Sequence, residues 1–253
     1  MASLSLGTER WRHNRPFEMI TNCFIINMII IHIHTILFVF VYLESSTNLS
    51  TLATDPRDIV NKHNALRRGV RPTASNMLEM SWSNEAAANA QRWANTCSMK
   101  HSPDTSGCGE NLYMSSFKNT WSNAVQSWYD EVKDWRYGVG STNGGIVGHF
   151  TQIVWYRSNK VGCAVAYCPN SPYKYFYVCQ YCPPGNLQLA RPYKSGPSCG
   201  DCPNACNDKL CTNSCPYTDQ YSNCAELKQQ WGCTNSNVAS WCPASCKCGS
   251  EIH

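Results

Sequence analysis

Apolar side chains recur every three or four residues in three segments between positions 55 and 135, the spacing that forms one face of a helix. Asp55-Pro56 can open the first helix, Ser83 can cap the second, and the third runs from about Thr120 to Trp135. The residues that we expect to face inward are Ile59, His63, Leu66 and Val70; Ala86, Ala90, Trp93 and Cys97; and Val125, Trp128, Tyr129 and Val132.

Two later runs have the composition of strands. Val161–Tyr167 and Lys174–Tyr181 are rich in valine and aromatic residues, and both follow a glycine-rich stretch at 138–145. Helices packed around a small antiparallel sheet are the economical arrangement for this order of elements. The sequence therefore predicts an α+β domain that begins near Asp55 and ends near Arg191.

The pattern changes after residue 198. Ten cysteines lie between Cys199 and Cys248, while Leu, Ile and Val become rare. Such a segment cannot bury enough apolar area to offset the entropy of ordering its chain. We expect disulfides, each worth about 2–4 kcal/mol, to hold this region in shape, with residues 192–198 as a linker before it.

The cysteine content also indicates the compartment. All but one of the 17 cysteines lie between Cys97 and Cys248, and an even number remains once Cys23 is set aside. Cysteines at this density are typical of oxidising, extracytoplasmic environments. The chain has 21 Lys and Arg against 17 Asp and Glu, with no basic run, which argues against a nucleic-acid partner.

Residues 24–43 carry no charged side chain and are long enough to span a bilayer as a helix. Polar positions within this stretch favour a cleaved secretory signal peptide, with Ser45-Ser46 or Thr51-Leu52-Ala53 as cleavage sites. An uncleaved signal anchor is the alternative, and both interpretations place the cysteines outside the cell. The one glycosylation sequon, at Asn48, survives only if cleavage occurs upstream of it.

Several short motifs match other chemistries. Cys179-Gln-Tyr-Cys182 and Cys199-Gly-Asp-Cys202 have the C-x-x-C spacing of redox and zinc sites, but disulfides are expected in a secreted chain. Gly196-Pro-Ser-Cys-Gly200 matches the nucleophile elbow, which needs a preceding strand where this chain has a proline-rich linker. Because the sequence offers no convincing nucleophile, we expect a non-enzymatic protein.

Two histidines and two glutamates form a candidate polar site. His101, Glu110, Glu131 and His149 lie near cysteines and aromatic residues in the first domain. Two imidazoles and two carboxylates suit a divalent metal or a shared proton. Since the four residues are scattered along the chain, their spacing fits equally well with satisfied polar groups in a cleft.

Four segments carry a family resemblance. GHFTQIVWYRS at 148–158 and YVCQYCPPGNLQ at 177–188 are the strongest, and HNALRR at 63–68 and CGENLY at 108–113 support them. Together they resemble the motifs of the CAP superfamily, which includes cysteine-rich secretory proteins, antigen 5 and pathogenesis-related 1 proteins. The ten cysteines after residue 198 resemble the second domain of cysteine-rich secretory proteins.

The resemblance implies an α-β-α sandwich followed by a small, mainly helical, disulfide-rich ShK-like module of the ion-channel-regulator type. The implied organisation is a leader at 1–53, a CAP domain at 54–191, a linker and disulfide hinge at 192–214, and the module at 215–248.

The resemblance also implies a cysteine pairing, which spacing alone leaves open. The eight implied disulfides are Cys97–Cys168, Cys108–Cys182, Cys163–Cys179, Cys199–Cys206, Cys202–Cys211, Cys215–Cys248, Cys224–Cys242 and Cys233–Cys246.

The family's cleft tetrad corresponds to His101, Glu110, Glu131 and His149. Relatives bind zinc-like ions there through the histidines, so the resemblance implies a weakly bound zinc or other divalent cation at His101 and His149. Imidazoles must be neutral to coordinate a metal, so we expect affinity to fall as the pH drops through about 6.5.

The resemblance further implies regulation of ion channels or cell-surface interactions, including roles in reproduction on sperm surfaces. Channel-plugging toxins of this fold place a lysine and an aromatic in the stretch that matches 234–241, which here has no lysine. Lys228 and Trp231 offer a basic–aromatic pair nearby, although an exposed helix face explains them equally well. Binding of a sterol or other lipid is the alternative function; Tyr173–Tyr181 would line a groove, although core packing is a competing role for these aromatics.

Overall fold

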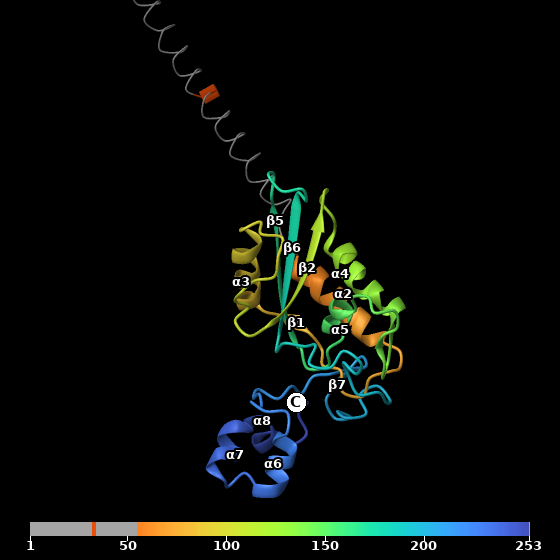
Figure 1. Cartoon of the computed structure of the whole chain (residues 1–253), viewed down its shortest axis with the longest axis vertical. Helices are drawn as coiled ribbons and strands as arrows, with labels where there is room; N and C mark the ends of the chain where they lie inside the picture. The colour runs from red at the N-terminus through yellow and green to blue at the C-terminus, as the bar shows by residue number, and fades with distance from the viewer. Residues whose placement is uncertain (1–31, 34–54, 253) are drawn as a thin grey trace, which may run out of the picture. The chain divides into compact units, whose positions relative to one another are not determined.

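The computed structural model describes residues 32–33 and 55–252 (Figure 1). The proposed cleavage sites, the Asn48 sequon and all of the apolar stretch except His32 and Ile33 lie outside the described residues. Within the part of the chain that the structure describes, no helix is long and apolar enough to cross a membrane.

A four-stranded sheet forms the centre of the first domain, with the strand order β1-β5-β6-β2. Its strands are β1 (Ser81–Trp82), β2 (Gly109–Ser115), β5 (Lys160–Tyr167) and β6 (Tyr175–Cys182). The predicted pair of strands, β5 and β6, is antiparallel, and β2 also runs antiparallel to β6. The two-residue β1 pairs in parallel with β5 and forms one edge of the sheet.

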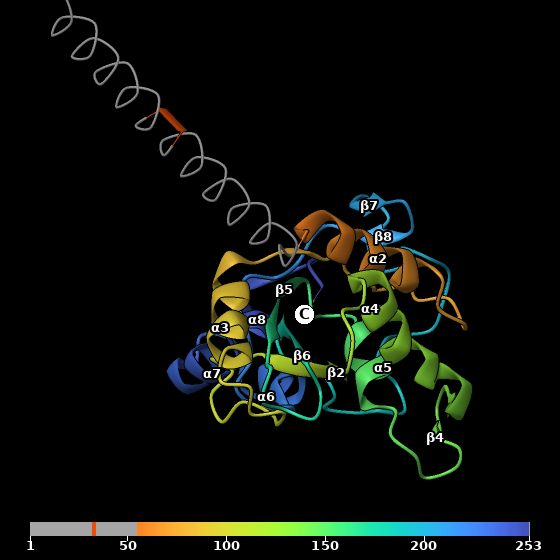
Figure 2. The same cartoon turned by 90° about the horizontal axis from the view of Figure 1, so that it is seen from above.

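Helices cover both faces of this sheet (Figures 1 and 2). One face carries α3 (Asn84–Ala94), and the opposite face carries α2 (Pro56–Arg68), α4 (Trp121–Tyr129) and α5 (Gly148–Ile153). Small side chains on α3, including the fully buried Ala90, pack against sheet residues such as Phe176. The expected α-β-α arrangement of an α+β domain is therefore confirmed.

The inner face of α2 differs from its prediction. Ile59 and His63 are buried as expected, but Leu66 is only half-buried, whereas Asn64 and Arg67 are buried. The polar pair is accommodated because distant backbone groups satisfy it: Asn64 exchanges hydrogen bonds of 2.8 and 2.9 Å with the backbone of Met80. Apolar spacing therefore predicted the buried face, with Ile59, His63 and Val70 on it, but missed its two buried polar residues.

The third predicted helix is shorter than expected. It ends at Tyr129, and a 3-10 helix (Asp130–Asp134) leads into β3 (Trp135–Arg136), which pairs with β4 (Gly140–Ser141). Besides Leu66, the residues expected to face inward that are only half-buried are Trp93, Cys97, Tyr129 and Val132. The 3-10 segment lies next to the first turn of α5, because the Glu131 carboxylate accepts hydrogen bonds from the backbone of that turn.

The segment at 192–198, predicted as a linker, lies against the first domain. The Ser75 N–H donates to Lys194 O, and the Gly196 N–H donates to Thr73 O, each over 2.9 Å. Tyr193 is buried. Beyond it, a hairpin of β7 (Cys206–Asn207) and β8 (Leu210–Cys211) pairs through Cys211 with Leu78. Residues 192–198 are thus held against the first domain by backbone hydrogen bonds rather than forming a flexible linker.

The C-terminal region consists of three short helices, α6 (Cys224–Trp231), α7 (Ser236–Trp241) and α8 (Pro243–Lys247). Two cysteines and Val238 form its small buried cluster. The carboxylate of Asp219 accepts the backbone N–H groups of Ala244 and Ser245 at the start of α8. Sulfur therefore supplies most of a core that contains little aliphatic surface.

The structure contains eight disulfides among its described residues, and they join the pairs that the family resemblance implies. Three connect elements of the first domain, two lie in the hinge and three lie in the C-terminal region. Neither C-x-x-C match is a redox or zinc site, because each of its cysteines forms a disulfide with a partner outside the motif.

Candidate metal centre

The first half of the candidate centre joins the loop after α3 to the start of β2. His101 Nδ1 lies 2.8 Å from Glu110 Oε1. The same carboxylate accepts the Ser102 N–H at 2.9 Å, and the Gln180 side chain donates to its other oxygen at 3.3 Å. The Glu110 side chain is 3% exposed and that of His101 is 63% exposed. A buried, immobilised carboxylate thus orients an exposed imidazole.

The second half joins the 3-10 helix to the first turn of α5. His149 Nδ1 lies 2.6 Å from Glu131 Oε1. The backbone N–H groups of His149 and Phe150 both donate to Glu131 Oε2 at 3.0 Å. The Trp128 indole stacks against the imidazole with 6.4 Å between ring centroids. Both the carboxylate and the indole therefore fix the orientation of His149.

Asn111 connects these two halves. It follows Glu110 on β2, and its side-chain amide donates to the backbone oxygen of His149 at 3.0 Å. This bond holds the strand that carries one carboxylate against the helix that carries one imidazole. The four tetrad residues nevertheless form two pairs, since no three of their possible ligand atoms lie within 4.8 Å of one another.

The ring nitrogens determine what each pair can do chemically. A carboxylate oxygen can only accept a hydrogen bond, so each Nδ1 carries the proton in the neutral imidazole. The Nε2 atoms of His101 and His149 then remain as lone-pair donors. A carboxylate behind a histidine is the usual support for a metal-ligating imidazole, so these residues have the donor chemistry for a divalent cation.

A second group of possible metal ligands does not fit a metal. The sulfurs of Cys199, Cys202 and Cys211 are buried and lie within 4.8 Å of one another. All three are in disulfides, in the pairs Cys199–Cys206 and Cys202–Cys211. A disulfide sulfur lacks the thiolate that zinc requires, so this cluster is structural.

The other sequence candidates have structural roles. Ser198, from the nucleophile-elbow match, lies in a turn rather than between a strand and a helix. Lys228 donates to the backbone oxygen of Ser245 at 2.6 Å, so its ammonium already has a partner within the module. Among the strand aromatics, Phe176, Tyr177 and Tyr181 are buried in the core.

Sequence reasoning did not identify the supporting residues Asn111 and Gln180, and it expected Trp128 to face inward without a role beside His149. Asn111 and Gln180 lie inside the segments CGENLY and YVCQYCPPGNLQ, next to positions already singled out. Their place in those motifs was the signal that could have identified them. The sequence could not show which groups they contact, because these contacts depend on how the strands align. Glu110 lies opposite Gln180 across the β2–β6 pair, which only the folded sheet reveals.

Comparison with known proteins agrees with the fold and the motifs. The cysteine-rich secretory protein family (CAP) model matches residues 60–181, and the Crisp model matches residues 199–253. The crystal structure of NaASP2 with Zn2+ is 32% identical, with 64% of this chain and 97% of that chain covered at a TM-score of 0.55.

Two further solved structures are similar over the same region. Na-ASP-1 is 33% identical, with 63% of this chain and 48% of that chain covered at a TM-score of 0.52. BmVAL-1 is 30% identical, with 62% and 89% covered at a TM-score of 0.52. With both models matched along its length, the chain belongs to the cysteine-rich secretory protein family and carries the Crisp region at its C-terminal end.

Proposed function

We propose that this protein is a secreted, non-enzymatic binding protein. In this proposal it holds a divalent cation at its two His–Glu pairs and recognises an ion channel or another cell-surface protein through its C-terminal module. Proteins of this family generally act by binding rather than by catalysis. The eight disulfides agree with an extracellular location, to which a leader at 1–53 would direct the chain.

The same proposal divides the chain into a CAP domain at 54–191, a linker and hinge at 192–214, and a module at 215–248. The leader would be a cleaved signal peptide or, as the alternative, a signal anchor. The matches to the family models, at 60–181 and 199–253, are compatible with this division.

The observation that carries the metal proposal is the pair of carboxylate-backed imidazoles. His101 and His149 would supply the protein ligands through Nε2, while Glu110 and Glu131 would hold the rings in place. Zinc commonly takes four ligands, so water or a partner molecule would complete the shell and binding would be weak. The related NaASP2 was solved with Zn2+, which supports zinc as the first ion to test.

Calorimetric titration of the full chain with zinc tests this assignment. We expect His101→Ala combined with His149→Ala to abolish zinc binding. A His253→Ala variant, which removes a histidine outside the tetrad, should retain it. Unchanged binding by the double variant would refute the metal site.

The module offers an aromatic surface for protein recognition. Tyr221 and Trp241 form an exposed edge-to-face pair with 5.8 Å between ring centroids, and Trp231 is 59% exposed. The Lys247 ammonium lies 4.5 Å from the centroid of the Tyr217 ring. Because disulfides hold these side chains in place, they can bind with little further loss of entropy.

Patch-clamp recording across a panel of channels tests the recognition proposal. We expect the full chain to change the current of at least one channel and Trp241→Ala to weaken the effect. Tyr173→Ala, which truncates an exposed aromatic of the first domain, is the matched control. A panel without any response would contradict channel regulation.

Lipid carriage is the less favoured function. The buried aromatics of β6 fill the core, and the Tyr177 hydroxyl donates to the Asn119 backbone oxygen at 2.7 Å. Core packing therefore accounts for the residues that suggested a lipid groove. A sterol-export assay with residues 54–191 would favour lipid carriage if it showed activity while the module had no effect on currents.

A further inference from the structure

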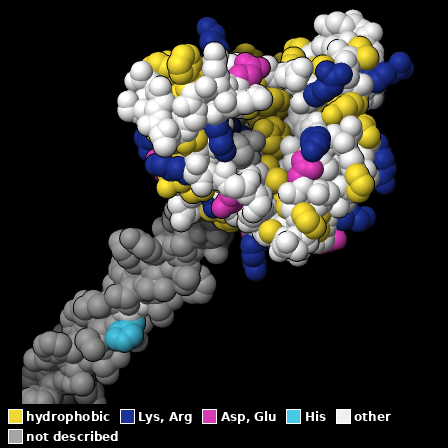
Figure 3. Space-filling view, turned by 90° about the horizontal axis from the view of Figure 1, so that it is seen from below, with side chains coloured by type: hydrophobic (Ala, Val, Ile, Leu, Met, Phe, Trp, Pro, Cys, Tyr) yellow, Lys and Arg dark blue, Asp and Glu magenta, His cyan; other side chains and the backbone are white. Residues whose placement is uncertain are grey.

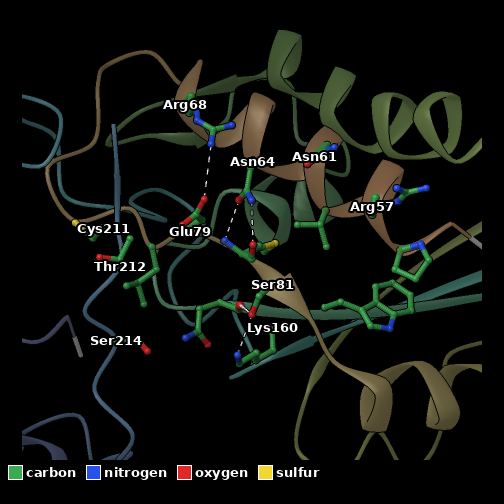
Figure 4. Close-up of a pocket in the computed structure, with 16 residues that line it drawn as sticks. Arg57, Asn61, Asn64, Arg68, Glu79, Ser81, Lys160, Cys211, Thr212 and Ser214 are labelled. Carbon is green, nitrogen blue, oxygen red and sulfur yellow. Dashed lines mark hydrogen bonds and ion pairs between the residues drawn. The ribbon is translucent and has the colours of Figure 1, made fainter. Parts of the chain in front are cut away.

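A pocket of about 560 Å³ lies where α2, the β1 segment, the start of β5 and the segment that follows the hinge hairpin meet (Figure 4). Arg57 and Asn61 of α2, Ser81 of β1, Lys160 of β5 and Thr212 of the hinge contribute to its wall. Both the first domain and the hinge are needed to form it. No residue of the two His–Glu pairs lines it, so it is a separate site.

The charges in this pocket leave a cation uncompensated. Arg68 lies 3.8 Å from the Glu79 carboxylate and 2.9 Å from that of Asp208, so its charge is compensated. The Lys160 ammonium donates to the Ser81 hydroxyl at 2.8 Å and forms no ion pair with a described residue. A lysine has three N–H donors, so two remain for a ligand. Arg57, at the rim, forms an ion pair of 3.7 Å with Asp55, so Lys160 is the cation of this pocket that has no carboxylate partner among the described residues.

The uncharged side chains of the pocket could bind a ligand ring that carries hydroxyl groups. The side-chain amides of Asn61 and Asn159 have no hydrogen-bond partner among the described residues, so both are available to hydroxyl groups. The Trp82 indole N–H already donates to Asn84 at 3.0 Å, which leaves the ring itself as an apolar surface. A sugar presents this combination of hydroxyl edges and an apolar face, and a cation beside it would select an acidic sugar.

The pocket continues into two further hollows of about 470 Å³ and about 620 Å³. Lys160 lines all three, and Trp82 lines the first two. The additional hollows contribute Arg92 and Arg157, whose hydrogen bonds run to neutral oxygens of Asn89 and Tyr217. The space-filling view from below shows a hollow with Lys and Arg side chains on both sides (Figure 3).

The lining of these three hollows contains five basic residues and two acidic ones. The basic residues are Arg57, Arg68, Arg92, Arg157 and Lys160, and the acidic residues are Glu79 and Glu85. Arg57 and Arg68 pair with carboxylates, whereas Lys160, Arg92 and Arg157 have no carboxylate partner among the described residues. Three such cations spread along a groove, rather than gathered in one pocket, fit a linear ligand with repeated negative groups.

We propose that this groove binds a linear sulfated glycan of the cell surface, with Lys160 contacting a sulfate group at the point where the three hollows meet. An acidic peptide would satisfy the cations but would make poor use of the carboxamides and the Trp82 ring. The glycan is therefore the occupant that the whole lining favours. The site would hold the secreted protein near cell membranes independently of metal binding at the His–Glu pairs.

Calorimetric titration of the full chain with a heparin-derived hexasaccharide, in the presence of EDTA, tests the proposal. We expect Lys160→Gln to weaken binding about five- to tenfold, and Lys160→Gln with Arg92→Gln to weaken it further. Lys118→Gln, an equal change of net charge at an exposed lysine outside these hollows, should leave the affinity unchanged.

Two further arms identify the ligand class. A chemically desulfated hexasaccharide should bind far more weakly, and Trp82→Ala should weaken glycan binding while thermal unfolding shows that the variant is folded. Equal losses in the Lys160 and Lys118 variants would show only a net-charge effect and overturn the site. Equally tight binding of an oligoglutamate of matched charge would assign the groove to acidic peptides and overturn the glycan.

Discussion

In the buried core between α2 and the sheet, His63 Nε2 lies 2.9 Å from the hydroxyl oxygen of Tyr181. The other ring nitrogen of His63 lies 2.8 Å from the backbone oxygen of Ile59, which can only accept, so Nδ1 carries the proton. Nε2 therefore accepts the Tyr181 hydroxyl, and this tyrosine lies within 3.5 Å of the Asn111 amide. The core thus contains a polar chain that reaches the strand carrying Glu110.

Protonation of His63 should destabilise the fold in acid. Burial lowers the pKa of His63 to about 4, against 6.5 for the unfolded chain, and the nearby Arg67 cation acts in the same direction. The unfolded state therefore binds the extra proton first, and stability falls as the pH drops from 6.5 towards 4. The loss is about 3 kcal/mol over this window.

Denaturant unfolding with the disulfides intact, at a series of pH values from 7 to 4, measures this loss. His63→Gln removes the titrating group, so its unfolding free energy should depend less on pH across the same window. Identical pH profiles for the variant and the parent chain would show that other groups cause the acid sensitivity.

Removal of the Tyr181 hydroxyl should weaken the fold even though the ring is retained. Tyr181→Phe leaves His63 Nε2 buried without its donor, which we expect to cost about 1–3 kcal/mol in unfolding free energy. Tyr175→Phe is the matched control, because the Tyr175 ring is only partly buried and its hydroxyl has no hydrogen bond to a described residue. Equal stabilities of the two variants in urea would contradict this account.

The sequence predicted those features that depend on neighbouring residues. Asp55 and Ser83 cap α2 and α3 as expected, through hydrogen bonds of 2.9 and 3.2 Å to backbone N–H groups. The strands β5 and β6 begin within one residue of their predicted starts, because valine and aromatic residues favour strands locally. Local propensity was sufficient for these elements.

Features that depend on distant partners could not be obtained from residue patterns. Asn64 and Arg67 are buried because backbone groups far along the chain satisfy them, which no helical periodicity reveals. Residue types alone indicated the four tetrad residues only as scattered polar groups, and the family resemblance supplied their grouping, since His149 and Glu131 lie on separate elements. Asn111, which links the two pairs, was not identified because its partner is a backbone oxygen on another element.

The carboxylate behind each histidine should tune zinc affinity in the proposed metal site. Glu131→Gln removes the negative charge that orients His149 Nδ1, and we expect zinc affinity to fall about 10- to 100-fold. Glu226→Gln, on the exposed surface of α6, should not change it. Zinc titration of both variants by calorimetry checks this, and equal affinities would remove Glu131 from the supporting role.

The module should depend on its buried Cys224–Cys242 disulfide more than the hinge depends on Cys199–Cys206, in which Cys199 is buried and Cys206 is exposed. Cys224 and Cys242 are buried and form most of the cluster around Val238. Replacing both by alanine should cost about 2–5 kcal/mol and open the module to proteases. The same replacement at Cys199 and Cys206, where Cys206 is exposed, should have a smaller effect.

Limited proteolysis followed by mass spectrometry measures the difference between these two double variants. Cleavage within residues 215–248 should accelerate only when the Cys224–Cys242 bond is absent. If the module resisted proteolysis equally well in both variants, its shape would not depend on this bond.

Arg67 shows how a buried cation can be stabilised without a carboxylate. Its guanidinium donates to the backbone oxygens of Leu78, Ile153, Trp155 and Tyr156 over 2.6–3.0 Å. Burial lowers its pKa to about 9, which leaves it charged at neutral pH. The four carbonyls lie on the segment before β1, on the last residue of α5 and on the segment that follows it, so one side chain holds these segments against α2.

Arg67→Lys should therefore destabilise the protein although the charge is kept. Lysine has three donors on a single nitrogen, whereas the arginine fork makes five hydrogen bonds to four carbonyls. At least two hydrogen bonds from a buried cation are lost, although the Trp155 and Tyr156 oxygens also accept the N–H groups of Ser158 and Leu78. We therefore expect a loss of about 1–3 kcal/mol in unfolding free energy. Arg68→Lys, at a partly exposed ion pair with Asp208 and Glu79, should change stability by less than 1 kcal/mol or so. Denaturant unfolding of the two variants, measured under the same conditions, separates the effect of hydrogen-bond geometry from that of charge. Similar losses of unfolding free energy in both variants would mean that the positive charge alone holds these segments together.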